Sequence, residues 1–198
     1  MFIFYPSEIK SLIIKERNIY KQYMFPTRIR FLMAWLKCEP TYKIMQWQTL
    51  ARISDYYHKK SHAHTASIFS KIAFLWYESK RNRMSLKLGI EIGTGNIGCG
   101  LLVYHCAGGI VVNVHSHIGE NCHLHGNNCI GNAGPNDRRC PRIGNNVMLG
   151  VGAKIIGNVR VADDVIIAAG AVVVKDVLEA GCTVAGIPAK IIKHRYYE

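Results

Sequence analysis

An aliphatic residue recurs at every sixth position through much of the C-terminal half of this chain, and no other feature constrains the fold as strongly. The two unbroken series are Val112, Ile118, Leu124 and Ile130, followed after a gap by Ile143, Leu149, Ile155, Val161, Ile167 and Val173. A period of six fits neither an α-helix nor a half-buried strand, and a β-sandwich would show strands about 8–12 residues apart. The pattern predicts a triangular coil in which each six-residue unit supplies one short strand and one corner.

Stacking of successive coils follows from this geometry, because no single coil can bury its inner face alone. Residues three units apart, such as Leu149 and Ile167, should lie on top of each other. Glycine directly follows several of the aliphatic residues, as at Gly119 and Gly144. We expect these glycines at corners that require a positive φ.

Two interruptions break the period. Between Ile130 and Ile143 the segment NAGPNDRRCPR must leave the coil as a loop. Between Val103 and Val112 the spacing is nine residues instead of six, and this insertion contains His105. Functional residues concentrate where a rigid scaffold is interrupted, so both places are candidate sites.

The N-terminal part of the chain has a helical composition. All 18 glycines lie from Gly89 onward. Apolar residues at helical spacing predict helices around three groups and a further helix from Trp47 to Tyr57. The three groups are Ile9, Leu12, Ile13 and Ile19; Ile29, Leu32, Met33 and Leu36; and Ile68, Ile72, Leu75 and Trp76. The chain is therefore predicted to be α+β, with a helical domain over residues 1–88 and a β-helix domain over residues 89–198.

Positive charge belongs almost entirely to the first of these domains. Residues 1–88 contain 16 Lys and Arg against 5 Asp and Glu, a net charge of +11, whereas residues 89–198 contain 9 against 8, a net charge of +1. A solvated helical face would explain the excess, and so would peripheral association with anionic lipid or attraction of an anionic substrate. No nucleic-acid recognition motif accompanies the charge, so nucleic acid is not predicted as a partner.

A cytoplasmic location is the expectation from the remaining sequence features. The seven cysteines are odd in number and include no C-x-x-C pair, which favours reduced thiols over disulfides. No apolar run approaches the roughly 18 residues of a membrane-spanning helix, and the N-terminal residues do not resemble a signal peptide.

The stretches LLVYHCAGGIVVNVHSHIGENCHLHGNNCIGNAG, CPRIGNNVMLGVGAKIIGNV, AAGAVVVKDV and AGIPAKIIK resemble the serine acetyltransferase family of hexapeptide acyltransferases. The resemblance covers about residues 89–193 and is strongest to the branch found in capsule and exopolysaccharide gene sets. It implies a left-handed parallel β-helix and homotrimers. It also implies transfer of acetyl from acetyl-CoA to a hydroxyl, with CoA in the groove between neighbouring β-helices.

The catalytic residues that the resemblance implies are His105 as general base and Glu91 as its acidic partner. An alcohol is a poor nucleophile at neutral pH, and an imidazole can take its proton as it attacks the thioester. A carboxylate on the second ring nitrogen would fix the tautomer and stabilise the imidazolium. Backbone N–H groups of Gly108, Gly109 or Gly131 could bind the developing oxyanion.

The resemblance also implies contacts with CoA. Backbone at Gly131, Asn132 and Ala133 would approach the pantetheine arm, beside small residues at Ala168 and Ala169. The adenine nucleotide would lie along a C-terminal segment that includes Ala185, Gly186, Pro188 and Lys190. Lys175 and Lys190 could bind its phosphates, although each lysine could equally be a solvated surface residue.

Departures from the family pattern bear on the acceptor. Tyr104 stands where an aspartate usually precedes the histidine, and the loop reads DRRCP where the family has D-R-H-P. Arg139 and Cys140 therefore occupy the places of an Arg-His pair that grips the carboxylate of serine. We predict Tyr104, Arg139 and Cys140 as substrate-binding residues and the hydroxyl of a sugar or polysaccharide precursor as the acceptor. The alternative is the serine O-acetyltransferase of cysteine biosynthesis.

Two alternatives come from other functional classes. His115, His117, His123 and His125 form two H-x-H pairs, which could hold zinc as in a γ-class carbonic anhydrase-like hydratase. The two pairs should lie on different faces of the coil, and AGIPAKIIK has no role in a hydratase, so no metal site is predicted. The other alternative is a non-catalytic β-helix scaffold, for which His105 and the loop would have no role.

Overall fold

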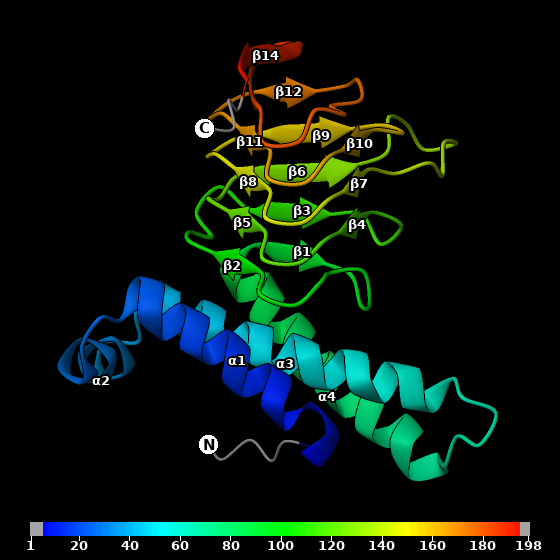
Figure 1. Cartoon of the computed structure of the whole chain (residues 1–198). Helices are drawn as coiled ribbons and strands as arrows, with labels where there is room; N and C mark the ends of the chain where they lie inside the picture. Colours follow the sequence, from blue (N-terminus) through cyan, green and yellow to red (C-terminus); the bar gives the residue numbers. More distant parts are fainter. Residues whose placement is uncertain (1–5, 195–198) are drawn as a thin grey trace. The chain divides into compact units, whose positions relative to one another are not determined.

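The computed structural model describes residues 6–194, and the chain divides between Leu88 and Gly89 into two compact units (Figure 1). The helical unit contains α1 (Ser7–Met24), α2 (Arg28–Leu36), α3 (Pro40–Ser61) and α4 (Ile68–Leu88). All the segments with predicted helical spacing are helical. Helix α3 is the centre of this unit, packs against the other three helices and carries the fully buried Ile44, Trp47 and Ile53.

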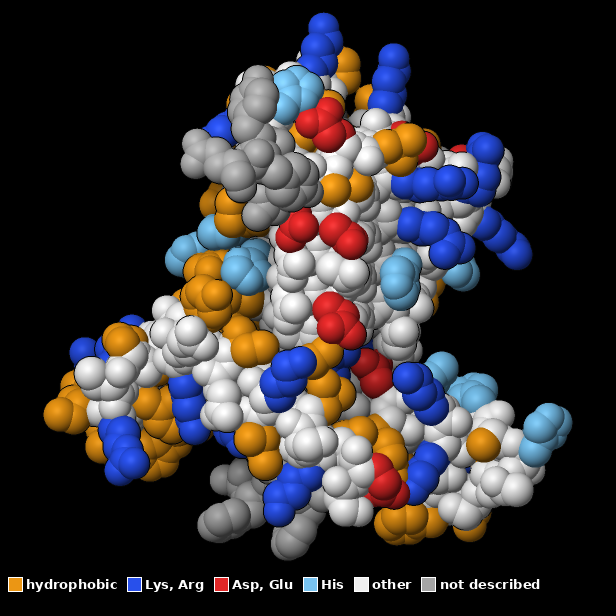
Figure 2. Space-filling model, viewed as in Figure 1, with side chains coloured by type: hydrophobic (Ala, Val, Ile, Leu, Met, Phe, Trp, Pro, Cys, Tyr) orange, Lys and Arg blue, Asp and Glu red, His pale blue; other side chains and the backbone are white. Residues whose placement is uncertain are grey.

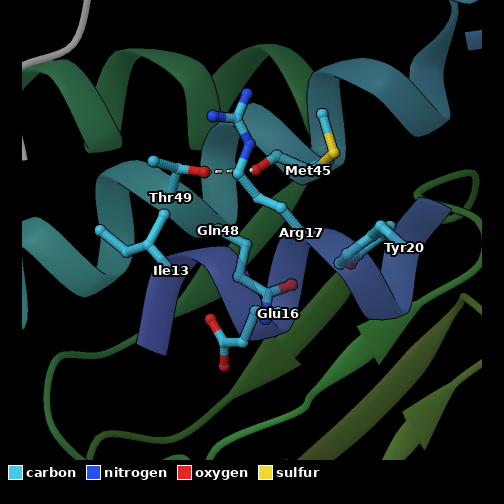
Figure 3. Close-up of a pocket in the computed structure, with 7 residues that line it drawn as sticks. All are labelled: Ile13, Glu16, Arg17, Tyr20, Met45, Gln48 and Thr49. Atoms are coloured by element: carbon cyan, nitrogen blue, oxygen red, sulfur yellow. Dashed lines mark hydrogen bonds between the residues drawn. The ribbon is translucent and has the colours of Figure 1, made fainter. Parts of the chain in front are cut away.

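A recess between α1 and α3 is closed by its own side chains (Figure 3). Glu16 of α1 is buried and accepts hydrogen bonds from the Arg52 guanidinium, with an Nη2–Oε1 distance of 2.7 Å. Thr49 donates from Oγ1 to the carbonyl oxygen of Met45 at 3.0 Å. The recess has no volume that would admit a water molecule, so it is part of the helical packing and not a ligand site.

Two of the apolar faces with predicted helical spacing are exposed. On α4, Ile68, Phe69, Ile72, Leu75 and Trp76 are each at least half exposed, from 50% at Trp76 to 73% at Ile68. On α2, the exposed apolar residues are Ile29, Leu32, Met33, Trp35 and Leu36. The spacing thus identified the helices, but the apolar faces of α2 and α4 are not buried in the core of this chain.

The second unit is a parallel β-helix with three faces, which Figure 1 shows as stacked coils. The first face carries β1 (Ile90–Ile92), β3 (Ile110–Val112), β6 (Asn128–Gly131), β9 (Lys154–Ile156) and β12 (Val172–Val173). The second face carries β4 (His117–Ile118), β7 (Arg142–Ile143) and β10 (Arg160–Val161). The third face carries β2 (Leu102–Val103), β5 (His123–Leu124), β8 (Met148–Leu149), β11 (Ile166–Ile167), β13 (Thr183–Gly186) and β14 (Ala189–Lys193). Strands on a face pair in parallel, except that β14 pairs antiparallel with β13 at the end of the coil.

The predicted six-residue series forms the core of this unit. All ten of its members are at most 4% exposed. Leu149 and Ile167 are register partners on β8 and β11, as the stacking rule requires. The two predicted interruptions leave the coil as loops after β2 and after β6.

The glycines that follow the aliphatic residues have a different role from the predicted one. Gly119 does not adopt a positive φ; a Cβ there would lie 2.5 Å from the carbonyl oxygen of Gly144 in the next coil. The positive φ angles fall on other residues, among them Asn121, Asn146 and Asp164. Glycine is needed after the aliphatic residue because successive backbones approach closely, whereas asparagine and aspartate tolerate the left-handed corner.

No helix in the described range 6–194 combines the length and the apolar character needed to cross a membrane.

Candidate active site

His105 lies at the corner that joins the third face to the first, which we call the His corner. Here one residue from each coil lies above the next, in the order Tyr104, His125, Gly150, Ala168 and Ala185. Backbone hydrogen bonds to the following coil hold this column in register, from Tyr104 N to Leu124 O at 2.9 Å and from Ala168 N to Val184 O at 2.9 Å. His105 follows Tyr104 and is exposed. The nine-residue spacing therefore places an imidazole outside the coil at one end of a column of mostly small residues.

Three aromatic rings lie close together at the His corner. The Tyr104 ring stacks on His125, with centroids 4.2 Å apart and planes 11° apart, and it lies 5.7 Å from His123. The Nε2 atom of His125 is buried without a hydrogen-bond partner in the described part of the chain. Burial lowers the pKa of His123 and of His125, and His125 and His105 respectively lower these two pKa values further by charge repulsion. The lowered pKa values favour the neutral form of both rings.

Sequence reasoning did not find the partnership of His125 with Tyr104. The sequence indicated the two H-x-H pairs only as candidate zinc ligands. The available signal was the six-residue frame itself, because Tyr104 and His125 each directly follow an aliphatic residue that points into the core on the same face.

The close approach of the His105 backbone to the following coil requires a glycine there. A Cβ at Gly126 would lie 2.9 Å from the His105 carbonyl oxygen and 3.3 Å from the His105 Cβ, and Gly126 has a φ of +106°. Any larger residue would push the two coils apart at this corner. We therefore assign Gly126 a role in positioning the His105 backbone.

Glu91 lies on β1 of the first face, opposite Val111, with its side chain exposed. Within residues 6–194 no hydrogen bond or ion pair joins Glu91 to His105. The two predicted catalytic residues belong to the same end of the coil, but their side chains are not hydrogen-bonded to each other. Of the predicted oxyanion donors, Gly109 N–H already donates to Cys106 O at 3.1 Å. The Gly108 N–H has no partner among the described residues.

The loop of residues 132–141 leaves the corner between the first and second faces, which we call the loop corner. Asn132 holds this loop: its Oδ1 accepts from Asn113 at 2.9 Å, and its Nδ2 donates to the carbonyl oxygens of Gly134 and Asp137. The side chain of Asn132 is thus structural, while Gly131 is buried at the end of β6 and Ala133 is exposed.

The predicted acceptor-binding residues of this loop have unequal access. Arg139 is exposed and binds both carboxylate oxygens of Asp137, from Nε to Oδ1 at 2.9 Å and from Nη2 to Oδ2 at 3.1 Å. These hydrogen bonds from Arg139 lower the pKa of Asp137. Cys140 is only 7% exposed, so its thiol does not present a contact to a ligand at the surface of the loop.

The predicted CoA contacts fall into two groups on two different corners. Gly131, Asn132, Ala133 and Lys175 lie at the loop corner. Ala168, Ala169, Ala185 and Gly186 lie at the His corner, and Pro188 and Lys190 continue from there into the hairpin of β13 and β14. Both lysines are exposed. A single β-helix therefore does not unite the predicted contacts into one site.

The histidines considered for zinc separate in the same way. His117 lies on β4 of the second face, and His123 lies on β5 of the third face. Across residues 6–194, no group of three or more His, Cys, Asp or Glu side chains is arranged to hold a metal ion.

Comparison with known proteins connects this geometry to acyl transfer. The family model described as "Bacterial transferase hexapeptide (six repeats)" matches residues 140–175, which contain β7 to β12. No curated protein shows significant sequence similarity to the chain.

Solved structures resemble nearly the whole chain. Neisseria gonorrhoeae serine acetyltransferase is 25% identical with a TM-score of 0.68, and the match covers 97% of this chain and 69% of that one. Soybean serine acetyltransferase complexed with serine is 21% identical with a TM-score of 0.70, covering 94% and 70%. Brucella abortus strain S19 serine acetyltransferase in complex with coenzyme A is 24% identical with a TM-score of 0.68, covering 96% and 70%. These similarities confirm the predicted α+β fold, in which N-terminal helices precede a left-handed parallel β-helix.

Proposed function

We propose that this chain is an acetyl-CoA-dependent O-acetyltransferase in which His105 is the general base. The hexapeptide match and the serine acetyltransferase neighbours support an acyltransferase. The neighbour in complex with coenzyme A is consistent with acetyl-CoA as the cosubstrate. The observation that carries the proposal is the placement of His105. It is exposed at a break in the repeat and lies beside a column whose later members, Gly150, Ala168 and Ala185, are small.

The chemistry needs one proton acceptor and no covalent intermediate. A ring nitrogen of His105 takes the proton of the acceptor hydroxyl while the oxygen attacks the thioester carbonyl carbon. The Gly108 N–H is a donor for the oxyanion that forms. The carbon–sulfur bond then breaks, the imidazolium returns its proton to the leaving thiolate, and the products are the acetyl ester and CoA. Small side chains in the column leave space for the pantetheine arm to reach this point.

Two acceptors are candidates. The comparisons support serine, the predicted alternative, better than a sugar, because the neighbours are serine acetyltransferases and one of them is complexed with serine. The loop favours a sugar hydroxyl, because Arg139 is occupied by Asp137 and Cys140 is buried. Two arguments support the assignment of the chain to the capsule and exopolysaccharide branch: this loop chemistry and the sequence resemblance.

The test of the activity is release of the CoA thiol from acetyl-CoA in the presence of a hydroxyl acceptor. L-serine, free sugars and nucleotide sugars form the acceptor panel, and mass spectrometry should show one acetyl group added to the acceptor. Absence of CoA release with every member of the panel, from a folded protein that binds CoA, would contradict the proposal. The cytoplasmic location and the division into a helical domain of residues 1–88 and an acyltransferase domain of residues 89–198 stay predictions.

A homotrimer would bring together the two corners that a single chain keeps apart. Each chain has a His corner with His105 and a loop corner with Arg139, at different edges of the same β-helix. Cyclic symmetry can place the His corner of one chain against the loop corner of the next, and three such contacts close the ring. The groove between two β-helices then has two walls, as a nucleotide cofactor requires.

Shared sites predict complementation between two inactive variants. We expect His105→Ala and Asn132→Ala, which removes the hydrogen bonds that hold the loop, to be impaired alone, and co-assembled chains to recover about one quarter of wild-type activity, because a quarter of random pairings join two intact halves. Steady-state turnover of the co-expressed chains, purified without selection for mixed trimers, measures this recovery. If both variants form trimers by light scattering and the mixture shows no recovery, each site lies within one chain.

Peripheral membrane association of the basic N-terminal half is a further part of the proposal. The exposed apolar face of α4, formed by Ile68, Phe69, Ile72, Leu75 and Trp76, is flanked by Lys71 and Lys80. The Lys80 Nζ lies 3.3 Å from the Trp76 ring centroid. Apolar and aromatic residues beside lysines are typical of helices that lie in a membrane interface. A second copy is the less favourable occupant, because each copy of residues 1–88 carries a charge of +11 and the two would repel.

This association predicts binding to anionic vesicles that both salt and apolar substitutions weaken. Vesicles with about one third phosphatidylglycerol in phosphatidylcholine should retain the wild-type chain in a flotation assay at low salt. Phe69→Ser should reduce retention, and Val151→Ser, which removes an exposed apolar residue from the β-helix, should not. If Phe69→Ser leaves retention unchanged, or if it only dissolves an assembly larger than a trimer, the face does not bind lipid.

A further inference from the structure

The second face of the β-helix carries a row of stacked cationic side chains that the proposed chemistry does not use. His117, Arg142 and Arg160 are register partners on β4, β7 and β10, and all three side chains are exposed. Neighbouring strands lie about 4.8 Å apart, so the three groups form an evenly spaced line. We call this set the cationic ladder.

Further positive charge gathers beside the ladder. Arg138 and Arg139 lie in the loop that leads into β7, and Lys175 lies at the loop corner. Five of the nine Lys and Arg residues of residues 89–198 therefore lie on or beside one face. Figure 2 shows this as a group of Lys and Arg side chains on the edge of the β-helix that carries β7 and β10.

Carboxylates lie beside the ladder, but in the described range none of them is paired with the guanidinium group of Arg142 or Arg160. No ion pair or side-chain hydrogen bond involves the guanidinium group of Arg142 or Arg160 there. Asp176 approaches Arg160, but its carboxylate accepts a hydrogen bond from the Arg160 backbone N–H at 2.9 Å. Like charges on adjacent strands oppose strand pairing. Two arginines on paired strands, neither of which has a carboxylate bound to its guanidinium group in the described range, offer free donors to an anionic ligand.

The geometry of the ladder limits the chemistry of that ligand. Arginine binds phosphate oxygens in a bidentate manner, and a rigid strand pair holds two guanidinium groups one strand spacing apart. Two adjacent phosphates can therefore each engage one arginine, while the His117 imidazole adds a third polar contact. A single carboxylate, such as that of a free amino acid, would engage only part of the row.

We propose that the cationic ladder binds the diphosphate of an activated sugar and thereby holds the acceptor for acetyl transfer. The inference rests on the proposed O-acetyltransferase function with its second candidate acceptor. The diphosphate of CoA is the less favoured occupant, because the predicted nucleotide contacts from Ala185 to Lys190 lie on the third face and only Lys175 lies beside the ladder. The ladder instead directly follows the loop of Arg139, the residue predicted to contact the acceptor.

Titration with inorganic pyrophosphate tests the ladder without turnover. Isothermal titration calorimetry on the full chain should show pyrophosphate binding, and Arg142→Gln and Arg160→Gln should each raise its Kd about tenfold, the usual loss for one charged hydrogen-bonding partner. Arg160→Lys should recover part of the affinity. Arg83→Gln removes another exposed charge, from α4, and should have no effect. Because these side chains are exposed, the variants should fold, which circular dichroism can check.

Kinetic measurements place the bound diphosphate in the reaction. In the double variant Arg142→Gln/Arg160→Gln, the KM for a nucleotide sugar should rise while the KM for acetyl-CoA stays unchanged. Competition by uridine diphosphate would identify a nucleotide-linked acceptor, and competition by a short polyprenyl diphosphate alone would identify a lipid-linked one. Both results support binding of the acceptor diphosphate by the cationic ladder.

Two results would overturn the inference. One is equal pyrophosphate affinity in the wild type and the double variant. The other is a rise in the KM for acetyl-CoA alone, which would assign the ladder to the cofactor. Failure of the proposed function is distinguishable from both, because pyrophosphate would still bind through the ladder while no acceptor is acetylated.

Discussion

Replacement of His105 by alanine should lower kcat by roughly 10²–10⁴, the usual contribution of a general base, while the protein keeps its fold. The imidazole is exposed at the His corner, so its removal leaves no cavity in the coil. The hydroxyl would then have to lose its proton to water. Steady-state CoA release with saturating acetyl-CoA measures the effect, and thermal unfolding checks the fold.

The matched control is His115→Ala, which removes another exposed histidine from the β-helix and should leave kcat unchanged. Activity of His105→Ala within a few-fold of the wild type would move the base elsewhere, with His123 as the next candidate. Chelator treatment of the wild type should not reduce turnover. Loss of activity that zinc restores would favour the hydratase alternative.

The core of the β-helix was predictable residue by residue because a six-residue period has one structural solution. Every member of the aliphatic series is buried, and partners such as Leu149 and Ile167 stack as the period requires. The role of Gly119 was not predictable in the same way. The close approach of Gly119 to Gly144 is a contact between coils, and the local sequence shows only that a small residue stands there.

The helices were also predictable from periodicity, but the function of their apolar faces was not. Helical spacing identifies a face that avoids water, and it does not say which surface covers that face. The Ile68–Trp76 face of α4 shows the consequence, because its residues remain largely exposed in the chain.

The chemistry of the candidate site was also only partly predictable from the sequence. The break in the period and the resemblance singled out His105, but neither indicated that Tyr104 stacks on His125. The resemblance placed Cys140 among the acceptor contacts, whereas the structure buries its thiol. Which face a loop residue presents depends on how the loop closes. Here closure depends on the hydrogen bonds of Asn132, which sequence spacing does not encode.

L-serine should be a poor acceptor if this loop cannot grip a carboxylate. Arg139 already holds the Asp137 carboxylate through two parallel hydrogen bonds, which is the geometry that a serine carboxylate would need. Cys140 is buried and a thiol is a weak donor, so the second contact is missing. Each absent charge-assisted contact lowers kcat/KM roughly 10–100-fold. We expect a KM for L-serine well above about 1 mM and a kcat/KM about 10² below that of the best nucleotide sugar.

L-serinamide is the matched control, since it keeps the hydroxyl and the amine but has no carboxylate. Without a clamp, the two compounds should have similar kcat/KM values, and Arg139→Gln should affect both equally. A KM for L-serine below 1 mM, a preference of at least about tenfold over serinamide, and loss of that preference in Arg139→Gln would show that Arg139 leaves Asp137 to bind the substrate. That result would establish serine as the acceptor. The ladder would then hold no part of the acceptor in this reaction, because serine has no group that spans Arg142 and Arg160, and pyrophosphate binding would remain the test of the ladder itself.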